Sequence, residues 1–105
     1  MRFVETTVFT RIITKILNDD QYRSMQLALA LRPEQGVVIR GSGGLRKLRW
    51  LVGSRGKRGG ARLIYYWDKS TETIFMLFVY TKKDQGDLTP DQVRILGQIV
   101  SEEFK

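Results

Sequence analysis

The chain has 105 residues, 42% of them hydrophobic and 10% aromatic, which suits one folded domain over residues 1–105 and excludes a disordered basic tail. It has no Cys and no His, which excludes disulfides and thiolate nucleophiles and leaves any catalysis to Lys, Arg, Tyr or carboxylates, with no metal or cofactor expected. The net charge is +7 and no apolar run could span a membrane, so we expect a cytoplasmic protein with a polyanionic partner.

The first third of the chain is predicted to form a short strand and a helix hairpin. The strand opens at residues 3–4, and a threonine at position 6 or 7 is the expected N-cap of a helix with apolar residues at helical spacing over residues 9–17. One of the two aspartates at 19–20 is expected to cap a second helix, which ends at Arg32-Pro33.

The remainder is predicted to form a sheet and a last helix. The Gly-rich residues 36–44 are expected to form a loop with a short extended piece at 37–39. Strands are expected over residues 45–52, 61–67 and 73–80. The last of these is nearly continuous in apolar residues, which predicts a central position covered on both faces. A Thr-Pro-Asp-Gln capping box at residues 89–92 then starts the C-terminal helix.

These elements predict an α+β fold, in which a small twisted, mainly antiparallel sheet packs on the N-terminal helix hairpin and a C-terminal helix follows. The positive charge is concentrated in residues 35–67, which carry eight cations and no acid, whereas the other ten cations face all eleven acids. A segment with only positive charges, interrupted by glycines and strand-forming apolar residues, is typical of a surface that binds nucleic acid. The alternative is that these side chains are simply exposed to solvent and bind no partner.

Strand parity supplies the first candidate site. Lys47 and Arg49 are two residues apart and must project from one side of the sheet. If the next two strands pair beside them, Arg62 and the pair Lys82-Lys83 can converge on the same place. Such a cationic pocket suits RNA cleavage, in which the ribose 2′-hydroxyl attacks the adjacent phosphorus and the protein moves protons and neutralises charge.

The side chains suggest a division of roles within this pocket. Arg49 and Arg62 stay protonated and have a planar donor fork, so we interpret them as phosphate clamps. Lys47, crowded by other cations, is expected to give up its proton and act as the base toward the 2′-hydroxyl, while Lys83 protonates the leaving 5′-oxygen. The loop 53–60 is expected to grip phosphates or ribosomal RNA through its basic side chains.

Three segments, GGLRKLR, GKRGGARLIYY and FVYTKKDQGDLTPDQ, together resemble the RelE/HigB-type toxins of bacterial toxin–antitoxin pairs. The resemblance covers essentially the whole chain in element order. It implies a RelE-like fold and an mRNA interferase that cleaves messages in the ribosomal A site. It implies that four residues are catalytic, namely Lys47, Arg49, Arg62 and Lys83. Lys83 stands where the RelE branch has an Arg, and no Tyr follows it in the last helix.

The resemblance also implies partners: the ribosome, its mRNA, and a cognate antitoxin of the helix-turn-helix DNA-binding type, through which alone the chain would contact operator DNA. The residues expected to bind RNA or the ribosome are Arg46, Arg55, Lys57, Arg58, Tyr65, Tyr80 and Lys82. Two other functions stay open, a ParE-like toxin that acts on DNA gyrase without nuclease activity and a non-catalytic RNA-binding module. Cleavage on translating ribosomes would separate them from the main interpretation.

Overall fold

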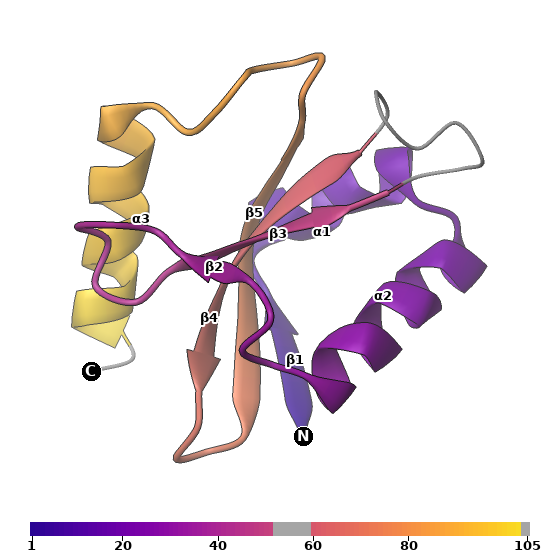
Figure 1. Ribbon diagram of the computed structural model, residues 1–105, viewed down its shortest axis with the longest axis horizontal. Coiled ribbons are helices and arrows are strands. Elements are labelled where there is room, and N and C mark those ends of the chain that lie inside the picture. The colour runs from indigo at the N-terminus through magenta and orange to yellow at the C-terminus, as the bar shows by residue number, and fades with distance from the viewer. Residues whose placement is uncertain (52–59, 104–105) are drawn as a thin grey trace.

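The computed structural model describes residues 1–51 and 60–103, and Figure 1 shows how its elements are arranged. In chain order these are β1 (Arg2–Glu5), α1 (Thr7–Ile16), α2 (Asp19–Leu31), β2 (Val37–Val38), β3 (Arg46–Trp50), β4 (Ala61–Asp68), β5 (Thr73–Thr81) and α3 (Pro90–Glu103). The predicted α+β fold is confirmed, including its C-terminal helix. Among the described helices, none is long and apolar enough to cross a membrane.

The five strands form one mixed sheet in the order β1-β5-β4-β3-β2. β1 runs parallel to β5, and the other neighbouring pairs are antiparallel, so the predicted mainly antiparallel sheet is confirmed. β5 lies between β1 and β4, and most of its side chains are buried, as its continuous apolar run predicts.

Helices cover both faces of this sheet (Figure 1). α1 and α2 pack on one face, hereafter the α1 face, and α3 packs on the other, hereafter the α3 face. The buried residues that α1, its C-cap and α2 contribute to the first core are Phe9, Ile13, Leu17, Met25 and Leu29. The buried residues of the second core are Leu45, Ile64, Leu77, Tyr80, Leu96 and Val100. The C-terminal helix therefore covers part of the second sheet face, and that face also carries the basic side chains described below.

Side-chain caps set where the helices begin. The Thr6 hydroxyl accepts from the Phe9 amide and starts α1. The expectation that an aspartate caps α2 is wrong, because Asn18 is the N-cap and forms a reciprocal capping box with Gln21. The two aspartates instead occupy the first turn of α2, where a carboxylate is stabilised by the helix dipole.

A β-bulge in β5 changes which side chains reach the α3 face. Ile64 pairs with Phe78 and Tyr65 pairs with Met76, so Leu77 has no partner opposite it on β4. Leu77 and Phe78, although consecutive, both pack in the core under α3. The alternation of faces along β5 is thus reversed after the bulge.

Candidate functional site

Three polar side chains form a row across the α3 face of the sheet. Arg49 on β3 pairs with Arg62 on β4, and Arg62 pairs in turn with Tyr80 on β5. Directly paired residues project from the same face, and Lys47, two residues from Arg49, shares that face. The structure therefore brings Lys47, Arg49 and Arg62 together on one side of the sheet.

Arg62 is the most unusual of these side chains because it is buried, with 7% of its surface exposed. Its Nη1 donates a 2.9 Å hydrogen bond to the Gly60 carbonyl oxygen. Within residues 1–51 and 60–103, no carboxylate lies within ion-pair distance of it. A guanidinium keeps its charge and has five N–H donors, and a buried unpaired charge is costly. This arrangement is typical of a site built for an anion rather than for stability.

Asp87 adds a carboxylate to the site and joins two strands. Its Oδ1 accepts from Lys47 Nζ at 3.2 Å and from the Tyr80 hydroxyl at 3.3 Å. The Leu88 backbone N–H and the hydrogen bond from Lys47 hold the pKa of Asp87 below its usual value. Burial, together with the nearby Asp87 charge, raises the pKa of Tyr80 to about 12, so its hydroxyl stays protonated and donates at neutral pH.

The connection between β5 and α3 fixes Asp87 in this place. The Gln85 Nε2 donates to the Asp87 carbonyl oxygen and to the Gln92 Oε1, both at 2.8 Å. Gln92 belongs to the predicted capping box, which is confirmed: its amide donates to the Thr89 hydroxyl and its side chain accepts from the Thr89 amide. The N-terminus of α3 is therefore linked through two glutamines to the carboxylate that contacts Lys47.

Lys47 has a carboxylate neighbour as well as the cations that its sequence context predicts. Its Nζ lies 3.2 Å from the Asp87 Oδ1. This contact weakens the argument for Lys47 as a base, because that argument rests on crowding by cations. Asp87 lies in the segment FVYTKKDQGDLTPDQ, which contributes to the resemblance described above. This aspartate was not predicted from the sequence to belong to the site.

Lys82 and Lys83 lie in the turn that follows β5, and both side chains are exposed. In the part of the chain that the structure describes, neither makes a hydrogen bond or ion pair with the other site residues. The turn places them one and two residues beyond Thr81, whose partner is Ala61, next to Arg62. They are thus at the same end of the sheet as Arg62 but are not held against it.

Two residues expected to bind RNA lie on the opposite, α1 face. Arg46 pairs with Tyr65, and its Nη1 donates to the carbonyl oxygens of Glu34 and Gly36. Tyr65 is fully buried, and its hydroxyl donates to the Pro33 carbonyl and accepts from the Gly36 amide. Their polar groups hold the loop before β2. Burial of Tyr65 in the first core gives no support to its predicted contact with RNA.

Tyr80 lies on the site face, but its ring is only 2% exposed, so a base has no room to stack on it. Its hydroxyl bond to Asp87 is what it contributes to the site. The expected loop residues Arg55, Lys57 and Arg58 lie outside the described residues. No group of three acidic side chains that could hold a metal ion occurs among the residues that are described.

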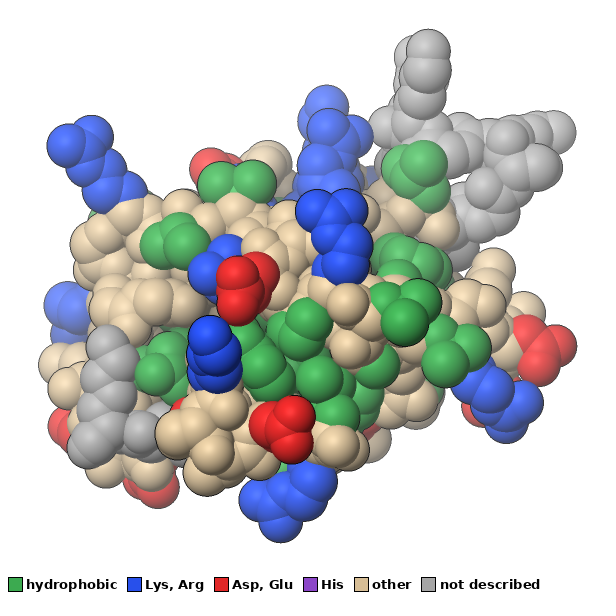
Figure 2. All heavy atoms as spheres, turned by 60° about the horizontal axis from the view of Figure 1, so that its bottom comes forward, with side chains coloured by type: hydrophobic (Ala, Val, Ile, Leu, Met, Phe, Trp, Pro, Cys, Tyr) green, Lys and Arg blue, Asp and Glu red, His purple; other side chains and the backbone are tan. Residues whose placement is uncertain are grey.

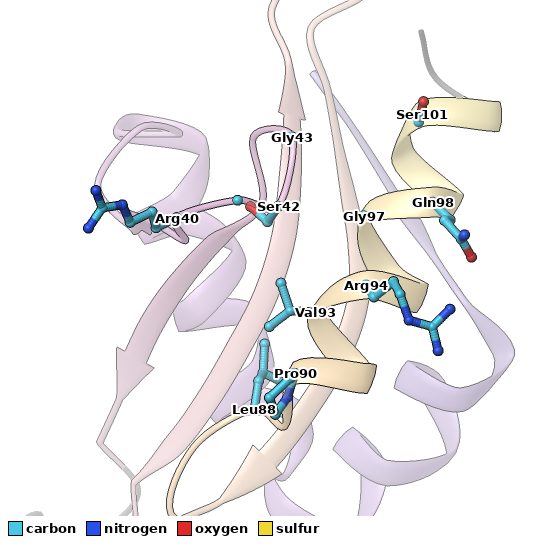
Figure 3. Close-up of a pocket in the computed structure, with 11 residues that line it drawn as sticks. Arg40, Ser42, Gly43, Leu88, Pro90, Val93, Arg94, Gly97, Gln98 and Ser101 are labelled. Carbon is cyan, nitrogen blue, oxygen red and sulfur yellow. The ribbon is translucent and has the colours of Figure 1, made fainter.

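Of the cavities that border the α3 face, two have charged side chains in their lining. One of about 170 Å³ lies beside Lys47 and Asp87, between β2 and the start of α3. A larger one, of about 610 Å³, lies between the 40–44 turn and α3 (Figure 3). Arg40 and Arg94 border this larger cavity, but their guanidinium groups point away from each other in Figure 3. The small cavity therefore adjoins the cationic group, whereas the large one lacks a convergent set of charges.

No protein-family model matches the sequence. Several solved structures resemble the fold, including two from E. coli. The crystal structure of the intact E. coli RelBE toxin–antitoxin complex contains a chain with 17% identity and a TM-score of 0.55, and the match covers 75% of this chain and 93% of that one. A double arginine-to-alanine mutant of E. coli toxin RelE in the free state has 18% identity and a TM-score of 0.57, with coverage of 80% and 85%. The chain therefore has the RelE fold.

Proposed function

We propose that this chain is the toxin of a toxin–antitoxin pair and that it acts as a metal-independent endoribonuclease on mRNA in the ribosomal A site. The observation that carries the proposal is the buried Arg62, which has no carboxylate partner among residues 1–51 and 60–103, beside Arg49 and Lys47 on one sheet face. The RelE fold supports the class of protein, and the positive charge supports an RNA substrate.

The proposed reaction forms a bond between the ribose O2′ and phosphorus and breaks the bond between phosphorus and O5′. Arg62 and Arg49 stabilise the negative charge that develops on the phosphoryl oxygens, and the ammonium of Lys47 adds to this stabilisation. The proton of the 2′-hydroxyl leaves to solvent water, and Lys83 donates a proton to the departing 5′-oxygen. The exposure of Lys83 on a turn leaves it free to reach the leaving group when RNA is bound.

The test is a primer-extension map of mRNA 5′ ends after incubation with the purified protein, with and without translating ribosomes. We expect cuts only when ribosomes are present and none with Arg62→Ala. Cuts on free RNA would overturn ribosome dependence. Inhibition of DNA gyrase without any RNA cleavage would identify the ParE-like alternative, and RNA binding without cleavage would identify a non-catalytic module.

A cognate antitoxin is the second part of the proposal. Large hydrophobic side chains are exposed at the end of α2 and on β2, namely Leu27, Leu31, Val37 and Val38. Figure 2 shows hydrophobic side chains gathered between charged groups on the face that it draws. Exposed apolar surface on a protein of charge +7 suits an acidic, partly apolar partner segment.

Hydrogen exchange of the complex would locate that partner. We expect protection within residues 10–31 or 93–104, which would leave the cationic face open and block ribosome entry by bulk. Protection over residues 45–52 and Arg62 would instead establish direct covering of the site.

A further inference from the structure

Asp87 connects two strands that are not neighbours in the sheet, through its contacts with Lys47 and Tyr80. Lys47 on β3 and Tyr80 on β5 are separated by β4, and one carboxylate oxygen accepts from both. Asp87 therefore lies above the middle strand, on the face that holds Arg62. Its side chain is 70% exposed, whereas that of Lys47 is 33% exposed.

We propose that Asp87 is a positioning residue, which holds the ammonium of Lys47 over the sheet face for the RNA cleavage proposed above. This inference rests on the proposed function. It assigns Asp87 a role through Lys47, without contact between Asp87 and the reacting phosphate. A carboxylate that touched the phosphate would repel it, so its place beside the cation matters.

The surroundings of Lys47 explain why one carboxylate matters there. Its own strand carries Arg49, the neighbouring β4 carries Arg62, and β5 carries Tyr80, whose hydroxyl is neutral. On its other side, β2 contributes only valines. Asp87 is thus the carboxylate that faces Lys47 in the described chain, against two arginines on the same face. Without it, repulsion between the cations would displace the Lys47 side chain from this place.

Asp87 is also held more firmly than an exposed loop carboxylate needs to be. The Leu88 amide donates to its Oδ1 at 2.8 Å, and Gln85 donates to its carbonyl oxygen. Gln85 is fixed in turn by Gln92 in the first turn of α3. A side chain must be positioned by such supporting contacts if it is to orient a functional group.

The experiment measures single-turnover mRNA cleavage at saturating ribosome concentration, from pH 6 to pH 9, for the unmodified protein and Asp87→Asn. We expect the cleavage rate of the variant to fall roughly three- to tenfold across this range, with ribosome affinity unchanged. The direction follows because the carboxylate holds the Lys47 ammonium in place, so its removal lets the side chain leave the sheet face. Asp87→Glu should restore part of the rate.

Two further variants keep the result interpretable. Asp91→Asn removes the same charge from an exposed ion pair with Arg94 in the first turn of α3 and should leave the profile unchanged. Tyr80→Phe keeps the buried ring and removes one contact to Asp87, so it should give a smaller loss even if Asp87→Asn fails to fold.

The possible outcomes separate the two proposals. Cleavage by Asp87→Asn with an unchanged rate and pH profile would overturn this inference and leave the proposed function intact. A faster rate at neutral pH would also overturn it, because it would mean that Lys47 works as a base that Asp87 restrains. No cleavage by the unmodified protein on translating ribosomes would overturn the proposed function itself, together with the role of Asp87 in it.

Discussion

At the scale of single residues, the burial of Arg62 separates function from stability. Arg62 is a cation with 7% exposure and no carboxylate partner among the described residues. Replacing such a group with an apolar side chain of similar length is often neutral or stabilising. Arg46, by contrast, lies on the α1 face and donates to two backbone carbonyl oxygens. Removal of Arg46 should therefore lower stability, whereas removal of Arg62 should lower cleavage.

We therefore expect Arg62→Met to lower cleavage on ribosomes by roughly a hundredfold or more, as the loss of a group that stabilises developing charge does. Its thermal unfolding midpoint should stay the same or rise. Arg46→Met is the matched control and should lower the midpoint without abolishing cleavage. Calorimetry and the primer-extension assay provide the two measurements. A large drop in the midpoint for Arg62→Met would show that Arg62 is a structural residue.

Tyr80 gives a prediction about pH. Its pKa is raised to about 12 in the folded protein, from 10.0, and burial is the main cause. Between these values the folded state holds a proton that the unfolded state has lost, so this residue's contribution to stability is present below about pH 10 and is lost as pH rises toward 12. Absorbance at 295 nm should show tyrosines that ionise late, and Tyr80→Phe should remove one of them. An unchanged titration curve would contradict the assignment.

At the scale of elements, the close approach of α3 to the 40–44 turn holds the helix on the sheet. A Cβ atom at Gly97 would lie 2.9 Å from the Ser42 carbonyl oxygen, which is backbone and cannot move alone. The glycine therefore lets α3 sit where its first turn can fix Gln85 and Asp87. Glycine is unfavourable in the middle of a helix, and at position 97 it allows this close packing.

Gly97→Ala should lower the free energy of unfolding by roughly 1–3 kcal/mol, as overpacking does, although Ala is the better helix former. It should also slow cleavage, because α3 and the loop before it shift together. Gly86→Ala is the control, since no atom lies within 4 Å of a Cβ there. Chemical denaturation of both variants is the measurement, and equal stability would contradict the packing argument.

Several elements could be predicted from the sequence because their signals are local. The capping box before α3 and the alternation along β3, which puts Lys47 and Arg49 on one face, need only neighbouring residues. The faces of Tyr65 and Tyr80 could not be predicted. β4 is buried on both faces, so its pattern does not say which side chains point where. The bulge at Leu77 then reverses the alternation before Tyr80, and a bulge depends on the partner strand.

Asp87 escaped prediction for a similar reason. It stands in a polar loop, forty residues from Lys47, and its role appears only when β3, β5 and the start of α3 meet. The parallel pairing of β1 with β5 likewise joins segments about seventy residues apart. Pairing between such distant residues cannot be predicted from the pattern of residues in a short stretch of sequence.

At the scale of the whole molecule, a charge of +7 should make ribosome binding strongly dependent on salt. Replacing Arg55, Lys57 and Arg58 together with Gln should reduce the slope of log affinity against log salt by roughly two to three units. The rate of cleavage at saturating ribosome should survive. The matched control replaces Arg11, Lys15 and Arg23, which are exposed on α1 and α2, and should change the slope less. Equal slopes for both triple variants would assign the loop to ordinary solvated surface.

The pairing of β1 with β5 also bears on how the chain folds. Arg2 pairs with Thr73 and Glu5 with Met76, so β1 has no partner in the sheet until β5 is in place. Pairings this distant in sequence form slowly, because the ends of a long loop must first meet. Phe3 of β1 packs against the first core, whereas no residue of β1 belongs to the second. The second core, under α3, can therefore assemble without β1, and the first core is completed only when β1 docks.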